Sequence, residues 1–194
     1  MSVDYYVAVE QERWPTPAAI NHCVAELHYP IKLVNIPEGK ADKPLREIPQ
    51  SMGLFVDLEG KEVPLETSIV QLAPGKPYAY GLRKDAPVTA EKTFPDGTKA
   101  IMYGPLGTNS FAPKDLNADL KGIGVPSPHF KNGDYVLTLS FRSEIAEYRA
   151  GSYLMAGLIK CFGGLGFELQ GPSFGTFAYA DALARSAADT KAWK

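Results

Sequence analysis

The stretch YVLTLSFRSEIAEYRAGSYLMAGLIKCFGG, residues 135–164, decides the fold that this sequence predicts. Its first seven residues, 135–141, are rich in β-branched and aromatic side chains, which suit the pleated surface of a sheet and predict a strand. Ser143 is a good N-cap for a helix that we expect to run to about Phe162. The helix should end at Gly163, because glycine adopts the left-handed conformation of a helix stop at little cost.

A short strand over 166–170 would complete a β-α-β unit, and the start of the chain predicts a second such unit. Residues 3–9 predict a strand. Thr16 can cap a helix that begins at Pro17, and residues 31–36 predict the strand that follows it. Two β-α-β units in one chain are typical of a ferredoxin-like α+β fold with a mainly antiparallel sheet. We therefore predict this fold class.

A strand-rich insertion is predicted between the two units, over roughly 37–133. Its expected strands cover residues 53–58, 67–73, 78–83 and 99–103. The stretches 37–50 and 104–133 are punctuated by proline and are expected to be loops, the second with at most one helical turn. The sequence leaves open whether the inserted strands extend the main sheet or form a second one. We treat residues 1–194 as a single α+β domain, with a final helix over 176–188.

The charge composition argues against several classes of function. The chain has 194 residues, with 20 Lys and Arg against 22 Asp and Glu, so its net charge is −2. No nucleic-acid partner is expected, because such proteins carry clustered basic residues and this sequence has no run of more than two.

The most apolar window, 153–162, contains Lys160 and is far shorter than a membrane span. The first ten residues contain Asp4 and lack the basic start of a signal peptide, so we expect a cytoplasmic protein without membrane contact.

Two cysteines, Cys23 and Cys161, lie far apart in the sequence, each inside a predicted helix. A disulfide-rich secreted domain would carry more cysteines, and a zinc site would place Cys or His in close pairs. We therefore interpret both as small, buried, apolar residues, as free cysteines commonly are. A long-range disulfide between them is the alternative.

The other motifs do not define a cofactor, a metal site or a catalytic residue, and we expect none. Ser173 stands in Gly-Pro-Ser-Phe-Gly, which departs from a nucleophile elbow, and we interpret it as a helix N-cap. His22 and Glu26 share one helix face at a spacing that a metal could use, but exposed helix-face residues have the same spacing. The glycines that begin at Gly163 follow a helix, whereas a dinucleotide-binding loop precedes one.

Charged residues gather where the clearest strand meets the clearest helix. Arg142 follows the strand, and Glu144 and Glu147 lie in the first turn of the helix. Their carboxylates suit the positive end of the helix dipole. In a buried cleft the same group could instead run acid–base chemistry. The first interpretation is favoured, because no histidine accompanies the group in the sequence.

Aromatic residues near loops favour a binding function. Trp14 lies near a turn, and Phe111 and Phe130 lie in the 104–133 loop, where exposed aromatic side chains could anchor a protein interface. The leading hypothesis is a non-catalytic binding protein that engages a protein partner through this loop. Its composition is comparable to that of small bacterial inhibitor or immunity proteins.

The alternative hypothesis is a small-molecule binding protein or a small enzyme, with a pocket between the sheet and the inserted strands. His129 would then join Arg142, Glu144 and Glu147 as the polar lining of the pocket. The predicted fold selects neither hypothesis, because folds of this class host many functions. The oligomeric state is left open.

Overall fold

The computed structural model shows an α+β fold of nine strands and four α-helices in the part of the chain that it describes. That part covers residues 3–45, 54–72, 88–93, 99–103, 113–122, 124–126, 129–141, 144–168 and 173–190. In chain order the elements are β1 (Val3–Val9), the 3-10 helix η1 (Gln11–Arg13), α1 (Pro17–Glu26), β2 (Ile31–Val34), β3 (Leu54–Leu58), β4 (Lys61–Gln71), β5 (Val88–Thr93), β6 (Lys99–Tyr103), α2 (Pro113–Gly122), β7 (Tyr135–Phe141), α3 (Ile145–Phe162), β8 (Leu165–Glu168), β9 (Ser173–Gly175) and α4 (Phe177–Asp189).

Seven strands form one antiparallel sheet in the order β2-β3-β4-β7-β1-β8-β9, and β5 pairs with β6 in a separate sheet. The ferredoxin-like arrangement is not confirmed. The hairpin β3–β4 is inserted between β2 and β7, and β9 extends the opposite edge. The insertion thus does both things that the sequence left open: β3 and β4 widen the main sheet, while β5 and β6 form a second one.

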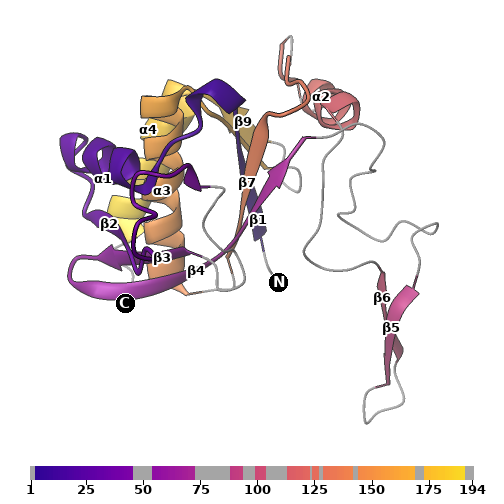
Figure 1. The fold of residues 1–194 in the computed structure, drawn as a ribbon. Coiled ribbons are helices and arrows are strands. Elements are labelled where there is room, and N and C mark those ends of the chain that lie inside the picture. Colours follow the sequence, from indigo (N-terminus) through magenta and orange to yellow (C-terminus); the bar gives the residue numbers. More distant parts are fainter. Residues whose placement is uncertain are drawn as a thin grey trace.

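Each face of the main sheet has its own hydrophobic core, because successive strand residues point to opposite faces. On one face Val7, Leu137 and Leu139 are buried with side chains of α1, α3 and α4. On the other face Ala8 and Val136 are buried with side chains of α2. Figure 1 shows this layering, with α1, α3 and α4 on one side of the sheet and α2 on the other. No helix among the described residues is long and apolar enough to cross a membrane.

The predicted start of α1 and the predicted end of α3 are confirmed. Thr16 Oγ1 accepts a hydrogen bond from the backbone N–H of Ala19 at 3.1 Å and so caps α1. Gly163 has a φ of 66° and ends α3 in the left-handed conformation. The N-cap position of α3 is Glu144, one residue after the predicted Ser143, which lies outside the described residues.

Helix α2 is the largest difference from the predicted secondary structure. The sequence predicts at most one helical turn within a long loop, and the structure has ten helical residues there. Leu116 and Leu120 are buried against the sheet, four residues apart on one face of the helix. Two leucines among polar residues are too weak a periodic signal to predict a helix. The expected strand at 78–83 lies outside the described residues, and β5 is not predicted by the sequence.

The buried side chain of Arg149, in α3, connects three parts of the fold. Its guanidinium nitrogens lie 3.2 and 3.3 Å from the two carboxylate oxygens of Glu59. Its Nε donates a hydrogen bond to the backbone carbonyl of Ala187, in α4, at 3.0 Å. Glu59 belongs to the turn between β3 and β4, so this bidentate pair fixes the inserted hairpin to both helices.

Candidate functional site

The edge of the sheet formed by β2 is closed by a side chain. Asn21 of α1 accepts a hydrogen bond from the backbone N–H of Leu33 at 2.7 Å. The same amide donates to the carbonyl oxygen of Leu33 at 3.1 Å. Both backbone groups that Leu33 would offer to a further strand are thus occupied, and the side-chain amide takes the place of a neighbouring peptide group.

The opposite edge, formed by β9, has no such closure among the described residues. β9 pairs with β8 through three residue pairs, the last of them Gly166 with Gly175, and no described strand lies on its other side. Directly after the strand, Phe177 begins α4 with 61% of its surface exposed. Ile145 is the other large hydrophobic residue found exposed in the described ranges, and it lies at the start of α3.

Tyr179 rests on two glycines of this edge. A Cβ at Gly166 would lie 2.8 Å from Cε1 of the tyrosine ring, and a Cβ at Gly175 would lie 2.5 Å from its Cβ. Any larger residue at either position would push α4 away from the sheet. The two glycines are cross-strand partners, so neither places a side chain between the Tyr179 ring and the backbone of the sheet.

A row of polar groups continues from this ring along the sheet. Ser173 Oγ lies 3.3 Å from the Tyr179 hydroxyl and 3.5 Å from Oε2 of Glu168, its cross-strand partner. Tyr5 stands on β1 one position beyond the last β1–β8 residue pair, next to Glu168. We call Tyr5, Glu168, Ser173 and Tyr179 the hydroxyl cluster; all four side chains are partly exposed.

The tyrosines of the hydroxyl cluster are neutral hydrogen-bond donors at physiological pH. Burial raises the pKa of Tyr5 far above its usual value, and the negative charge of Glu168 raises it further. Burial also raises the pKa of Tyr179, against a smaller opposing effect of its hydrogen bond with Ser173. Neither phenol can act as a base near neutral pH. The cluster therefore offers hydroxyl groups and one carboxylate to a bound group.

Ser173 is not a helix N-cap, and that prediction is wrong. The residue lies in β9, and Thr176 occupies the N-cap position of α4 without a capping hydrogen bond from its side chain. The chain forms this short strand before the helix begins.

Two of the predicted aromatic anchors are buried. Trp14 is 7% exposed, and its ring centroid lies 5.1 Å from that of Tyr135. Phe130 is 8% exposed and belongs to the core between the sheet and α2. The amide of Asn117 holds it there, with bonds of 3.2 and 2.8 Å to its backbone N–H and C=O. Phe111 lies outside the described residues.

The polar residues predicted to line a pocket do not come together. His129 precedes β7 and is exposed; its Nε2 lies 3.1 Å from Oε1 of Glu10 and its ring stacks on Phe130. Glu144 and Glu147 lie beyond the other end of β7, at the start of α3. The length of the strand therefore separates the histidine from the two carboxylates. Arg142 lies outside the described residues.

The spacing of His22 and Glu26 produces an ion pair, with 3.3 Å between Nε2 and Oε1 and both side chains largely exposed. Across the described ranges, no group of three His, Cys, Asp or Glu side chains is arranged to hold a metal. The pair thus belongs to the solvent-exposed face of α1.

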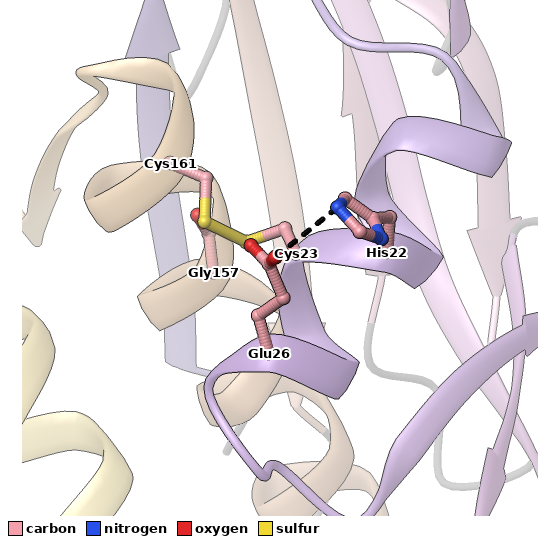
Figure 2. Close-up of a disulfide and its surroundings, with 5 residues drawn as sticks. All are labelled: His22, Cys23, Glu26, Gly157 and Cys161. Carbon is pink, nitrogen blue, oxygen red and sulfur yellow. Dashed lines mark hydrogen bonds and ion pairs between the residues drawn. A yellow bond between two sulfur atoms is a disulfide. The ribbon is translucent and has the colours of Figure 1, made fainter.

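The interpretation of the cysteines as free, buried residues is wrong. Cys23 of α1 and Cys161 of α3 form a disulfide across 138 residues of sequence, with 6.3 Å between their Cα atoms. Figure 2 shows the bond between the two helices, beside His22 and Glu26 of α1. The sequence offered the disulfide only as an alternative, because nothing in it places α1 against α3.

Comparisons with protein-family models, with curated proteins and with solved structures give no match for this chain. Function is therefore inferred from the described residues. The sequence did not indicate a role for Asn21 or Phe177. In the sequence Asn21 resembles any polar helix residue, and Phe177 resembles an ordinary core aromatic.

Proposed function

We propose that this chain is a non-catalytic binding protein that engages an extended segment of a protein partner along β9. The observation that carries the proposal is the difference between the two sheet edges. β2 is closed by the Asn21 amide, whereas no described strand pairs with the outer side of β9, and Phe177 is exposed beside it. A partner segment that adds a strand to such an edge gains main-chain hydrogen bonds and places alternate side chains on the two faces.

The surroundings of β9 suggest what such a segment would contact. On the helix side it would meet Ser173, the Tyr179 ring and Phe177, a combination of polar and aromatic groups typical of interface centres. On the other side it would meet Phe174, which packs near the core of α2. A Cβ at Gly124 would lie 3.6 Å from the Phe174 ring, so part of the predicted 104–133 binding loop borders the same edge.

This proposal keeps the partner class expected from the sequence and changes the contact residues. Phe130 supports the core, so its replacement would test folding rather than binding. Phe111 remains a proposed contact outside the described residues. The binding role does not depend on the cytoplasmic location expected from the sequence.

The experiment selects extended peptides from a displayed library on the immobilised protein and then measures their affinity for variants. Phe177→Asp should weaken binding by roughly 10–100-fold, because a charge replaces an aromatic anchor. Ile145→Asp is the matched control: it makes the same change at the other exposed hydrophobic residue, on α3, and should leave affinity unchanged. Protection of the backbone amides of 173–175 from hydrogen exchange on binding should accompany the selection. Equal effects of the two variants, or no protection at β9, would contradict the proposal.

A second candidate function is favoured by the hydroxyl cluster. Three hydroxyl groups and the Glu168 carboxylate could bind a small polar molecule through hydrogen bonds, without covalent chemistry. A thermal-shift screen of sugars, polyols and amines separates the two candidates. A ligand whose stabilisation is lost in Ser173→Ala and kept in Phe177→Asp would support the second candidate over the first.

A further inference from the structure

The disulfide joins two helices that come together only in the folded chain. Cys23 lies in the last turns of α1, and Cys161 lies in the last turn of α3. Their Cα distance of 6.3 Å falls within the range that a disulfide spans. Gly157 permits this approach, because a Cβ there would lie 3.0 Å from Cγ1 of Val24. The close contact of α1 with α3 thus sets the two sulfur atoms within bonding reach.

The two cysteine residues differ in their exposure to solvent. Cys23 is 3% exposed, and its Sγ lies 3.5 Å from the carbonyl oxygen of Gly157. Cys161 is exposed. Figure 2 shows Cys161 at the end of α3 and Cys23 on the side of α1 that faces that helix. A molecule from solution can therefore approach Cys161 more readily than Cys23.

We propose that Cys23 and Cys161 form a thiol–disulfide exchange site with a fixed order of reaction. Cys161 is the outer sulfur, which meets an incoming disulfide, either a small one or that of a disulfide oxidoreductase. Cys23 is the inner sulfur, which resolves the mixed disulfide and closes the helix-to-helix bond. The inference is independent of the binding role proposed for β9.

The steps balance as two successive exchanges. The Cys161 thiolate attacks one sulfur of an oxidant R–S–S–R, forms Cys161–S–S–R and releases one RS⁻. The Cys23 thiolate then attacks the Cys161 sulfur, forms the Cys23–Cys161 bond and releases the second RS⁻. Each leaving thiolate takes a proton, and the two cysteine thiols supply these protons. The two cysteines are oxidised by two electrons, and the oxidant is reduced to two thiols.

The surroundings favour the closed bond once it has formed. Both cysteines lie near helix C-termini, where the helix dipole disfavours a thiolate. The charged side chains around the two cysteines include Glu26 with its partner His22 on α1, Lys160 with its partner Asp181, and Arg13, whose guanidinium reaches Gly163 at the end of α3. A disfavoured thiolate is a poor leaving group, so reopening by an external thiol is slow. Such a bond persists in oxidising compartments, which favours these over the cytoplasm expected from the sequence.

The experiment exposes two folded single-cysteine variants, Cys23→Ser and Cys161→Ser, to oxidised glutathione and follows their intact mass. Cys23→Ser should gain one glutathione on Cys161. Cys161→Ser should react roughly 100-fold more slowly, because its buried thiol reacts only when the structure opens. In denaturant both should react at similar rates, which serves as the control. Equal native rates, or faster reaction of Cys161→Ser, would overturn the proposed order.

A measurement on the unaltered chain keeps the test valid if a variant does not fold. The oxidised protein is incubated with excess reduced glutathione until an adduct forms, quenched with acid and digested, and the glutathionylated cysteine is located by mass spectrometry. The proposal requires the adduct on Cys161. An adduct mainly on Cys23, or two free thiols in protein purified without reductant under air, would overturn it.

Discussion

The two edges of the seven-stranded sheet are finished in different ways. At β2 the helix α1 lies alongside, and its Asn21 amide occupies the backbone groups of Leu33. The disulfide at Cys23 fixes the same helix to α3. At β9 the strand is only three residues long, and Phe177 is exposed. Helix α4 packs there against Gly166 and Gly175, which have no side chains.

An open edge with exposed hydrophobic surface is a known risk for aggregation, and proteins commonly shorten or cover such edges. Here one edge is covered, whereas among the described residues the other is only shortened. The difference shows that a side-chain amide can close a sheet edge in this fold, and that Asn21 does so at β2. The β9 edge, which no described strand covers, is therefore the place to look for a partner, and the closed side is expected to serve stability.

The largest expected effect comes from removing the disulfide that fixes α1. Replacement of Cys23 and Cys161 together by serine should lower the free energy of unfolding by roughly 2–5 kcal/mol. The bond joins residues 138 positions apart, so its loss increases the conformational freedom of the unfolded chain. Urea denaturation with and without dithiothreitol measures the loss. The reductant should have no effect on the double variant. An unchanged stability would show that packing alone fixes α1.

The ion pair between the buried Arg149 and the partly exposed Glu59 should be next in size. Arg149→Ala removes the bidentate contact with Glu59 and the hydrogen bond to Ala187, and should cost about 3 kcal/mol. The paired replacement Arg149→Met with Glu59→Leu removes both charges and should recover much of this loss. The two variants are compared by chemical denaturation. A double variant as unstable as Arg149→Ala would mean that the hydrogen bond to Ala187 is the important contact.

The Asn21 amide should have a smaller effect on stability and a specific effect on association. Asn21→Ala removes two hydrogen bonds at β2 and should cost about 1–2 kcal/mol. It should also promote concentration-dependent self-association through the freed edge, measured by analytical ultracentrifugation. Asn117→Ala is the matched control, because Asn117 makes the same pair of bonds to Phe130 away from a sheet edge. Self-association of both variants to the same extent would contradict the role of Asn21 as an edge closure.

The sequence predicts local features of this fold well, because they depend on neighbouring residues. The cap at Thr16 and the stop at Gly163 follow from side-chain and backbone preferences within one turn. The position of β3 and β4 between β2 and β7 depends on pairing between distant strands, which no local pattern specifies. The disulfide likewise depends on the packing of α1 against α3, which no local pattern specifies, so the sequence predicted it only as an alternative.

The candidate site was harder to predict from the sequence than the fold. Phe130 and Phe177 are both aromatic residues beside loop signals, yet one is buried under α2 and the other is exposed beside β9. Their difference is set by which elements pack on each side of the sheet. Ser173 shows the same limit, because its role depends on Glu168 and Tyr179, which reach it only through strand pairing and helix packing.

The smallest expected effect concerns the side of the sheet at β9, where the partly exposed ion pair of Lys160 and Asp181 joins α4 to α3. The hydrogen bond from Lys160 lowers the pKa of the Asp181 carboxyl below its usual value. A lowered pKa in the folded state gives stability that is present above the pKa of the unfolded chain, about 4, and is lost as the pH falls through the folded value. The melting temperature of the unaltered chain should therefore fall slightly more steeply below about pH 4 than that of Asp181→Asn.

Asp189→Asn, further along α4, is the control and should keep the steeper fall. If Asp181→Asn shows the same acid profile as the unaltered chain, the pair contributes nothing measurable, as is common for exposed ion pairs, and α4 is held beside β9 by the Tyr179 contact with the two glycines.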